Sequence, residues 1–406
     1  MIIPLVLLFI ASAVYVYYAN AEALRDVQLD CKSVIDVHPD DIEKSLSQVQ
    51  TDMELGEPFR VYPIETSPDS ENVFRSTLIE YPFNSSPRAD SLDNVSLRGI
   101  ILYVHGYNDY FFQKELAEKA DSAGFAFFAI DLHYCGRSYV SDEPRGDMRN
   151  VKEYYAELDV AVELSKKIAV DDYEEAEHIP FVIIGHSLGG LISSLYVNDR
   201  SEEHFTALVL NSPFLDMNFN WFVRKVGLPF VSELALFLPD FTLGPTGDPN
   251  YAHSILKREK GEWEYNENLK SVVRPTQYLG WLRAIMNAQG RVHSKLKFKH
   301  PVLVMHSGCS IKSEEWSDDY RHCDGVLNVE HMDEWSPSLG DSVTTKVIQD
   351  GLHDLYLSRV AIVIDATSSH CAPSGSVGFH SQGENGLRWS GEHTNATDGF
   401  ASFWLV

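Results

Sequence analysis

The segment Gly185-His186-Ser187-Leu188-Gly189-Gly190 holds the residues best suited to nucleophilic chemistry. It directly follows the apolar run PFVII and directly precedes a helical pattern, so Ser187 is expected at a tight turn between a strand and a helix. Glycines two residues either side, Gly185 and Gly189, would let the strand and helix pass closely. The start of the helix would present free N–H groups to an oxyanion. The spacing predicts a nucleophilic Ser187, and a strand-to-helix turn without catalysis is the alternative.

A serine at neutral pH needs a general base, and His353 has the most suitable position among the 16 histidines. It stands in the turn QDGLHD after the strand-like run VTTKVI, where the last strand of a sheet would bring it to the nucleophile. An ordinary loop histidine is the alternative. We expect His105 to shape the turn before Gly106, and His186 to be a packing or hydrogen-bonding neighbour.

A carboxylate is expected just after the apolar run PVLVMHS at 301–307, where it would orient the base. We choose Asp324, because a glycine turn and apolar residues follow it in CDGVL and would hold the carboxylate inward. It would fix the tautomer of His353 and stabilise the imidazolium. The backbone N–H groups of Tyr107 and Leu188 would bind the oxyanion. Four other carboxylates after this run lie among charges and look solvated: Glu314, Glu315, Asp318 and Asp319.

Short apolar runs alternate with helical patterns along most of the chain. Such runs, uninterrupted by polar residues, are typical of strands buried on both faces. The pattern therefore predicts an α/β protein with a mostly parallel sheet and helices on both faces. Strands are expected within 58–81 and at 98–106, 125–131, 180–185, 206–214, 301–307 and 343–348, and helices at 113–124, 149–168 and 188–198.

The alternation stops between 215 and 299, in a segment rich in phenylalanine and tryptophan. We interpret this segment as an inserted helical cap or lid, and a fixed extra packing layer is the alternative. The last 41 residues, 366–406, show no apolar period and are expected to be a disordered tail. The predicted organisation is a leader (1–21), a lead-in (22–57), a first part of the main domain (58–214), the cap (215–299), a second part (300–365) and the tail.

Residues 2–18 are uncharged and mostly apolar, and small residues follow at 19–23. This pattern predicts a signal peptide, or a signal anchor that would attach the chain to a membrane. Glycosylation sequons at Asn84, Asn94 and Asn395 agree with a secretory route, ending in a secreted or membrane-anchored protein. Five cysteines are too few for a disulfide scaffold, and we expect Cys309 and Cys323 to pair.

The formal charge of −26 excludes several partners. A chain this acidic would repel phosphates, so neither nucleic acid nor charge-driven binding to anionic lipid is expected. The apolar content of 44% is that of a globular protein. Neither Cys-x-x-Cys nor His-x-x-x-His occurs, so the sequence predicts no metal site.

Five motifs in order resemble the α/β-hydrolase superfamily: HGYND (105–109), DLHYCGRS (131–138), GHSLGG (185–190), PVLVMHS (301–307) and DGLHD (350–354). The chain is more closely similar to the monoglyceride lipase, lysophospholipase and S33 serine aminopeptidase branch, over about residues 58–360. The resemblance implies that Ser187 is the nucleophile, His353 the base and Asp324 the acid, with the Tyr107 and Leu188 amides as oxyanion donors. It also implies ester hydrolysis, commonly of lipids, with no cofactor.

The chain departs from this family in three places. Tyr134 replaces a glycine of the family's D-x-R-G-H-G-x-S loop, a longer segment (308–323) displaces the acid, and no amphipathic C-terminal helix is legible after about residue 365. The sequence thus predicts a serine hydrolase of small or lipid esters, such as monoacylglycerol or lysophospholipid, acting through an acyl-enzyme. An S33-type aminopeptidase, an acyltransferase, a silent hydrolase-like ligand-binding protein and a membrane-tethered interaction protein are the alternatives.

Overall fold

The computed structural model describes residues 35, 37–67, 73–86, 96–172, 179–200, 202–245, 249–311 and 315–358. The expected leader (1–21) and tail (366–406) lie outside these residues, as do Asn94, Asn395 and Glu314. Among the described residues, none of the helices combines the length and the apolar character needed to cross a membrane.

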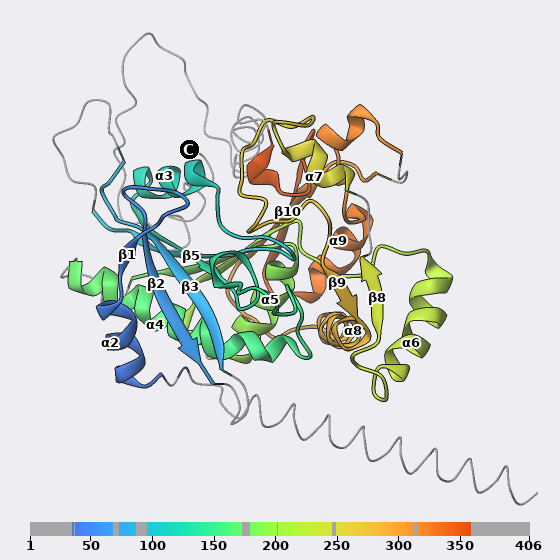
Figure 1. Cartoon of the computed structure of the whole chain (residues 1–406), viewed down its shortest axis with the longest axis horizontal. Coiled ribbons are helices and arrows are strands. Elements are labelled where there is room, and N and C mark those ends of the chain that lie inside the picture. The colour runs from blue at the N-terminus through green and yellow to red at the C-terminus, as the bar shows by residue number, and fades with distance from the viewer. Residues whose placement is uncertain are drawn as a thin grey trace, which may run out of the picture.

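A nine-stranded sheet forms the centre of the described structure (Figure 1). Its strands from β5 to β11 in spatial order run parallel, whereas β1, β2 and β3 pair antiparallel with their neighbours. The mostly parallel sheet predicted from the sequence is therefore confirmed. In spatial order the strands are β1 (Gln50–Thr51), β2 (Arg60–Thr66), β3 (Phe74–Tyr81), β5 (Phe125–Asp131), β4 (Gly99–Val104), β6 (Phe181–His186), β7 (Ala207–Asn211), β10 (Val302–Ser307) and β11 (Val343–Ile348).

Helices cover both faces of this sheet (Figure 1). Residues of α2, α4, α5 and α8 belong to the larger apolar cluster, and residues of α3 and α7 to the cluster on the opposite face. The α-helices are α2 (Pro39–Ser47), α3 (Lys114–Ser122), α4 (Tyr155–Asp172), α5 (Leu188–Asp199), α6 (Leu228–Leu234), α7 (Asn250–Ile255), α8 (Leu279–His293) and α9 (Val329–Trp335).

Strand β4 shows why the central strands read as unbroken apolar runs. Ile100 and Leu102 point into the larger cluster, while Ile101 and Tyr103 point into the cluster on the other face. All four side chains are at most 2% exposed. Because successive side chains of a strand point to opposite faces, both faces need apolar residues when helices cover both.

The segment expected to be a cap contains two different kinds of structure. Its first part holds a π-helical turn at Val223–Gly227, then α6, and a small sheet in which β8 (Thr242–Pro245) pairs with β9 (Thr276–Tyr278). Its last part is α8, whose Leu282, Ile285 and Val292 are buried in the cluster that also contains α5. We therefore propose that the cap ends before α8 rather than at 299, and that α8 belongs to the main body.

Candidate active site

Ser187 lies at the turn between β6 and α5 with a strained backbone, at φ 51° and ψ −115°. Its N–H donates to the carbonyl of Asn211 on the adjacent strand β7, at 3.0 Å. A Cβ added at Gly185 would lie 2.7 Å from the carbonyl oxygen of Gly189, and one added at Gly189 would lie 2.3 Å from that of His105. The two glycines are thus required by contacts with backbone, which fits the turn predicted from the sequence.

Replacing Gly189 with alanine should destabilise the protein by about 3 kcal/mol, because the added methyl group meets backbone that cannot rotate away. Gly290 offers a matched control, since it is also helical but a Cβ there would meet nothing within 4 Å. Gly290→Ala should stabilise by about 0.5–1 kcal/mol. Urea unfolding followed by circular dichroism measures both changes. Equal effects at the two positions would contradict this account of the turn.

His353 and Asp324 form a buried pair. The Nδ1 atom of His353 lies 2.8 Å from Oδ2 of Asp324, and the two side chains are 3% and 0% exposed. The other oxygen, Oδ1, accepts the N–H groups of Val326 and Leu327 at 2.8 and 2.7 Å. The two backbone N–H groups fix one carboxylate oxygen of Asp324, and the other oxygen faces His353. Asp324 therefore has the orientation that a carboxylate needs in order to orient a histidine.

The disulfide expected between Cys309 and Cys323 is present and explains how the acid reaches this position. It closes the longer segment after β10 into a loop. The N–H of Asp324 donates to the carbonyl of Cys309 at 2.9 Å, so the chain returns to the end of β10 at Asp324. Of the other candidates for the acid, Glu315, Asp318 and Asp319 are exposed.

The loop after β4 lies against the nucleophile. A Cβ on Gly106 would be only 3.1 Å from Cβ of Ser187, so the chain approaches closely here. Among the described residues, neither the N–H of Tyr107 nor that of Leu188 donates to a backbone carbonyl. His105 holds this loop, because its Nε2 accepts the N–H of Leu132 at 3.0 Å. Leu188 follows Ser187 at the start of α5, and Tyr107 follows Gly106, which approaches Ser187 closely, so both N–H groups belong to segments where an oxyanion site needs donors.

The ring of His186 fills the space beside the predicted base. Its centroid lies 4.9 Å from that of His353, and its Nδ1 lies 3.1 Å from the carbonyl of Asn211. Burial lowers the pKa of His186, so the ring is neutral at pH 7. This arrangement matches the packing and hydrogen-bonding role expected from the sequence.

A second buried carboxylate, Asp354, follows His353 and was missed by the sequence analysis. Its oxygens accept the side-chain amides of Asn211 and Gln113, each at 2.7 Å. Its N–H donates to the hydroxyl of Tyr251, whose ring lies 5.4 Å from that of His353. Asp354 could have been identified from the sequence, because it directly follows the predicted base. Nothing near Tyr251 in the sequence pointed to the site.

The family model for serine aminopeptidase, S33, matches residues 96–310, more than half of the chain. The chain belongs to the serine aminopeptidase S33 family. Phospholipase YtpA of Bacillus subtilis (strain 168) is 25% identical to it over 213 residues, which are 52% of this chain and 74% of that protein. A soluble variant of monoglyceride lipase from Saccharomyces cerevisiae, solved with a substrate analog, superimposes with a TM-score of 0.51 at 15% identity, covering 73% of this chain and 89% of that one.

The structural likeness confirms the α/β-hydrolase fold predicted from the sequence, and membership of the serine aminopeptidase S33 family makes the chain a hydrolase. The loop at 131–138 is closed by backbone hydrogen bonds despite its altered motif: the N–H of Cys135 donates to the carbonyl of Leu132 at 3.1 Å, and that of Ser138 donates to the carbonyl of Cys135 at 2.9 Å. Tyr134, where the family's motif has a glycine, adopts the left-handed φ of 60° that glycine would favour. His133, in the motif's arginine position, stacks on Tyr154 and bonds to Glu157 at 2.9 Å.

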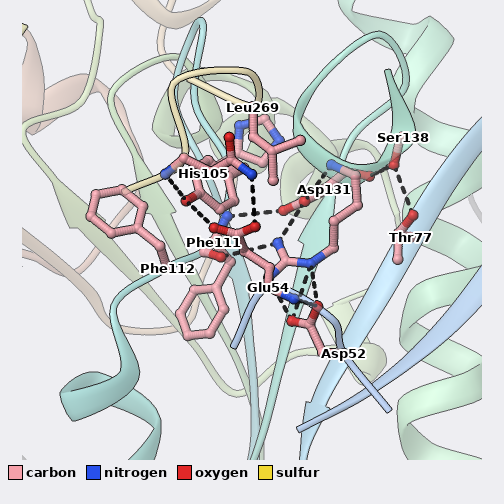
Figure 2. Close-up of polar contacts among 12 residues, drawn as sticks. Asp52, Glu54, Thr77, His105, Phe111, Phe112, Asp131, Ser138 and Leu269 are labelled. Carbon is pink, nitrogen blue, oxygen red and sulfur yellow. Dashed lines mark hydrogen bonds and ion pairs between the residues drawn. The ribbon is translucent and has the colours of Figure 1, made fainter. Parts of the chain in front are cut away.

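Figure 2 shows how the carboxylate of Asp131 ties this loop to its neighbours. Its Oδ1 accepts the N–H of Phe111 at 2.9 Å, and its Oδ2 accepts the guanidinium of Arg137 at 2.8 Å. Arg137 also donates to Asp52 at 2.6 Å. Phe111 belongs to the loop that carries Tyr107. The network therefore helps to fix the loop of the predicted oxyanion donor in place.

A buried ion pair joins the loop that carries Tyr107 to the inserted segment. Nζ of Lys270 lies 2.5 Å from Oδ1 of Asp109, and the two side chains are 8% and 1% exposed. Burial alone would raise the pKa of Asp109, but the charge of Lys270 holds it below its usual value. Asn108 strengthens the joint by donating to the carbonyl of Ser271 at 2.7 Å. The loop that carries Tyr107 is thus fastened to residues 270–271 of the inserted segment.

Replacing Lys270 with methionine should cost about 3–5 kcal/mol of unfolding free energy, because Asp109 would be left buried without a counter-charge. The double variant Lys270→Met/Asp109→Asn should recover most of that loss. Lys257→Met is the matched control, since Lys257 pairs with Glu264 at the surface with both side chains more than 60% exposed, and it should change stability by less than about 1 kcal/mol. Urea unfolding at pH 7 measures all three. No recovery in the double variant would contradict the pairing.

Proposed function

We propose that this S33 hydrolase cleaves carboxylic esters of lipids, such as monoacylglycerol or lysophospholipid, with Ser187 as nucleophile, His353 as base and Asp324 as acid. The observation that carries the proposal is the buried 2.8 Å contact between His353 Nδ1 and Asp324 Oδ2. The ring of His353 lies 4.9 Å from that of His186, which precedes Ser187 at its strained turn. A histidine that donates from Nδ1 has Nε2 free to accept a proton.

The reaction would proceed in two halves. Ser187 Oγ attacks the ester carbonyl carbon and its proton passes to His353 Nε2, while the Tyr107 and Leu188 N–H groups stabilise the oxyanion. The intermediate collapses, the alcohol leaves with the proton from His353, and the acyl group remains on Ser187. Water then attacks the acyl-enzyme with His353 again as base, which releases the acid and restores the serine. Asp324 stabilises the imidazolium in both halves.

Three observations support a lipid ester over other substrates. The relatives reported above are named a phospholipase and a monoglyceride lipase. The ring of Trp281 in α8 lies 5.1 Å from that of Tyr107, so an aromatic surface that suits an acyl chain adjoins one of the proposed oxyanion donors. The strong negative charge of the chain disfavours anionic polymers.

A substrate panel tests the proposal. Purified full-length protein would be assayed with p-nitrophenyl esters, monoacylglycerols, lysophospholipids and aminoacyl p-nitroanilides, with Ser187→Ala as the inactive control. We expect kcat/KM for at least one lipid ester to exceed that for every amide by about 100-fold, or about 2.7 kcal/mol in transition-state binding. Cleavage of amides without cleavage of esters would instead establish an aminopeptidase. Binding without turnover of any substrate would indicate a silent ligand-binding protein.

We also propose that the protein enters the secretory pathway. Its support is the uncharged run at 2–18 and the sequon at Asn84, whose side chain is exposed in the turn after β3. The protein would be purified from a eukaryotic host, and mass spectrometry before and after glycosidase treatment would show whether it carries glycans and at which residue it begins. Mature protein that starts at residue 1 and carries no glycan would contradict it.

A further inference from the structure

Asn211, the last residue of β7, contacts both the turn of the proposed nucleophile and the turn of the proposed base. Its backbone carbonyl accepts the N–H of Ser187 at 3.0 Å. Its side chain is fully buried and bonds to Asp354 and Leu355, the two residues that follow His353. One residue therefore connects the two turns through its main chain on one side and its side chain on the other.

The turn that carries His353 belongs to neither a strand nor a helix. β11 ends at Ile348, and the next element is the short 3₁₀ turn Leu355–Leu357. Hydrogen bonds within this turn fix its shape but not its distance from the nucleophile. Gln113 also bonds to the turn, but it has no bond to the turn at Ser187 within the described part of the chain.

The two contacts of the Asn211 side chain require an amide. Its Nδ2 donates to Oδ1 of Asp354 at 2.7 Å, and its Oδ1 accepts the N–H of Leu355 at 3.1 Å. A carboxylate only accepts hydrogen bonds and a backbone N–H only donates them, so this position needs one donor and one acceptor on the same side chain. Leucine, of similar size, offers neither.

Asn211 also keeps the second buried carboxylate away from the base. Each oxygen of Asp354 accepts a side-chain amide at 2.7 Å, one from Asn211 and the other from Gln113. With both oxygens engaged, Asp354 does not compete for the imidazole of His353. The ring is left to its contact with Asp324 at 2.8 Å.

We propose that Asn211 is a positioning residue that sets the distance between Ser187 and His353. The inference rests on the proposed catalytic roles of these two residues. A displacement of about 1 Å between reacting groups can lower a rate by about 100-fold, so a side chain that fixes their separation affects the rate without touching the substrate. Because the atoms of Asn211 take no part in the reaction, its effect should pass through His353.

A double-mutant cycle tests this in the full-length protein. A fluorophosphonate forms a covalent bond with an activated serine, and its rate of reaction at Ser187 is followed by mass spectrometry. We expect Asn211→Leu to react about 30-fold more slowly than the wild type, because the base is displaced. In the His353→Ala background the same substitution should change the rate by less than about threefold, since a residue that acts through the base has no effect once the base is gone.

Asp159→Asn is the matched control for a loss of stability alone. Asp159 is buried and accepts the hydroxyl of Tyr196 at 2.8 Å and the guanidinium of Arg200 at 2.9 Å, at the other end of α5 from Ser187. This variant should melt at a lower temperature than the wild type, yet react with the fluorophosphonate within about threefold of the wild-type rate.

Two results would overturn the proposal for Asn211. One is a folded Asn211→Leu that reacts as fast as the wild type, and the other is a loss of equal size with and without His353, which would place the effect in the fold. If Asn211→Leu does not fold, Asn211→Ser replaces it in the same cycle, because the smaller side chain fits the site and reaches neither partner. A wild-type protein that does not react at Ser187 would overturn the proposed function and this inference with it.

Discussion

Replacing Ser187 with alanine should lower kcat/KM for the best ester substrate by about 10⁵-fold, with little change in folding. The methyl group removes the atom that attacks the ester, and the remaining oxyanion donors and substrate contacts would supply only residual catalysis. Ser187 holds φ 51° with a side chain attached at Cβ, and the methyl group of alanine is smaller, so alanine can occupy the same turn. Initial-rate kinetics with a p-nitrophenyl ester, alongside a thermal melt, measure both consequences.

Ser193 provides a matched control in the same helix. It is fully buried, and its hydroxyl has no hydrogen-bond partner within the described part of the chain. Removing an unpaired buried hydroxyl should be close to neutral, so Ser193→Ala should keep kcat/KM within about threefold of the wild type. A similar loss of activity in both variants would mean that the effect at Ser187 arises from packing and not from chemistry.

Asp324→Asn should lower kcat by about 10⁴-fold, because an asparagine amide would present the wrong hydrogen-bonding partner to His353 and favour the wrong tautomer. The two N–H donors from Val326 and Leu327 would still hold the side chain, so the fold should persist. Stopped-flow or steady-state kinetics at pH 7–8 would measure the loss, with circular dichroism to verify folding.

Asp354→Asn distinguishes the two buried carboxylates near the base. Asp354 accepts hydrogen bonds from Asn211 and Gln113 and has none with His353 in the described structure. We therefore expect a loss of stability of about 1–3 kcal/mol and a kcat within about tenfold of the wild type, measured where the variant is folded. If Asp354→Asn lost activity as severely as Asp324→Asn while staying folded, Asp324 would not be the sole orienting carboxylate.

The sequence was sufficient where local pattern decides the structure. The turn at Ser187 followed from an apolar strand, a glycine pair and a helical period, and the contacts of Gly185 and Gly189 with backbone show the physical reason. Asp324 was chosen because apolar residues follow it in the sequence. Two of those residues, Val326 and Leu327, donate their backbone N–H groups to its carboxylate. The Cys309–Cys323 disulfide was expected from the loop that it closes.

The sequence was insufficient where distant segments meet. Lys270 and Asp109 are 161 positions apart, and Asp354 and Asn211 are 143 apart. Such pairs depend on how the inserted segment lies on the sheet, which no local periodicity encodes. For the same reason the aromatic content of the insertion did not reveal which side chains face outward: Trp281 is buried in α8, whereas Trp221 is exposed.

The most direct test of the catalytic account is the site and rate of labelling by a fluorophosphonate, which reacts covalently with activated serines. We expect peptide mass spectrometry of the labelled wild type to find the adduct on Ser187, no adduct in Ser187→Ala, and a labelling rate about 10³-fold lower in His353→Ala because the base is missing. A wild-type protein that does not react at Ser187, or a His353→Ala variant that reacts there as fast as the wild type, would contradict the account.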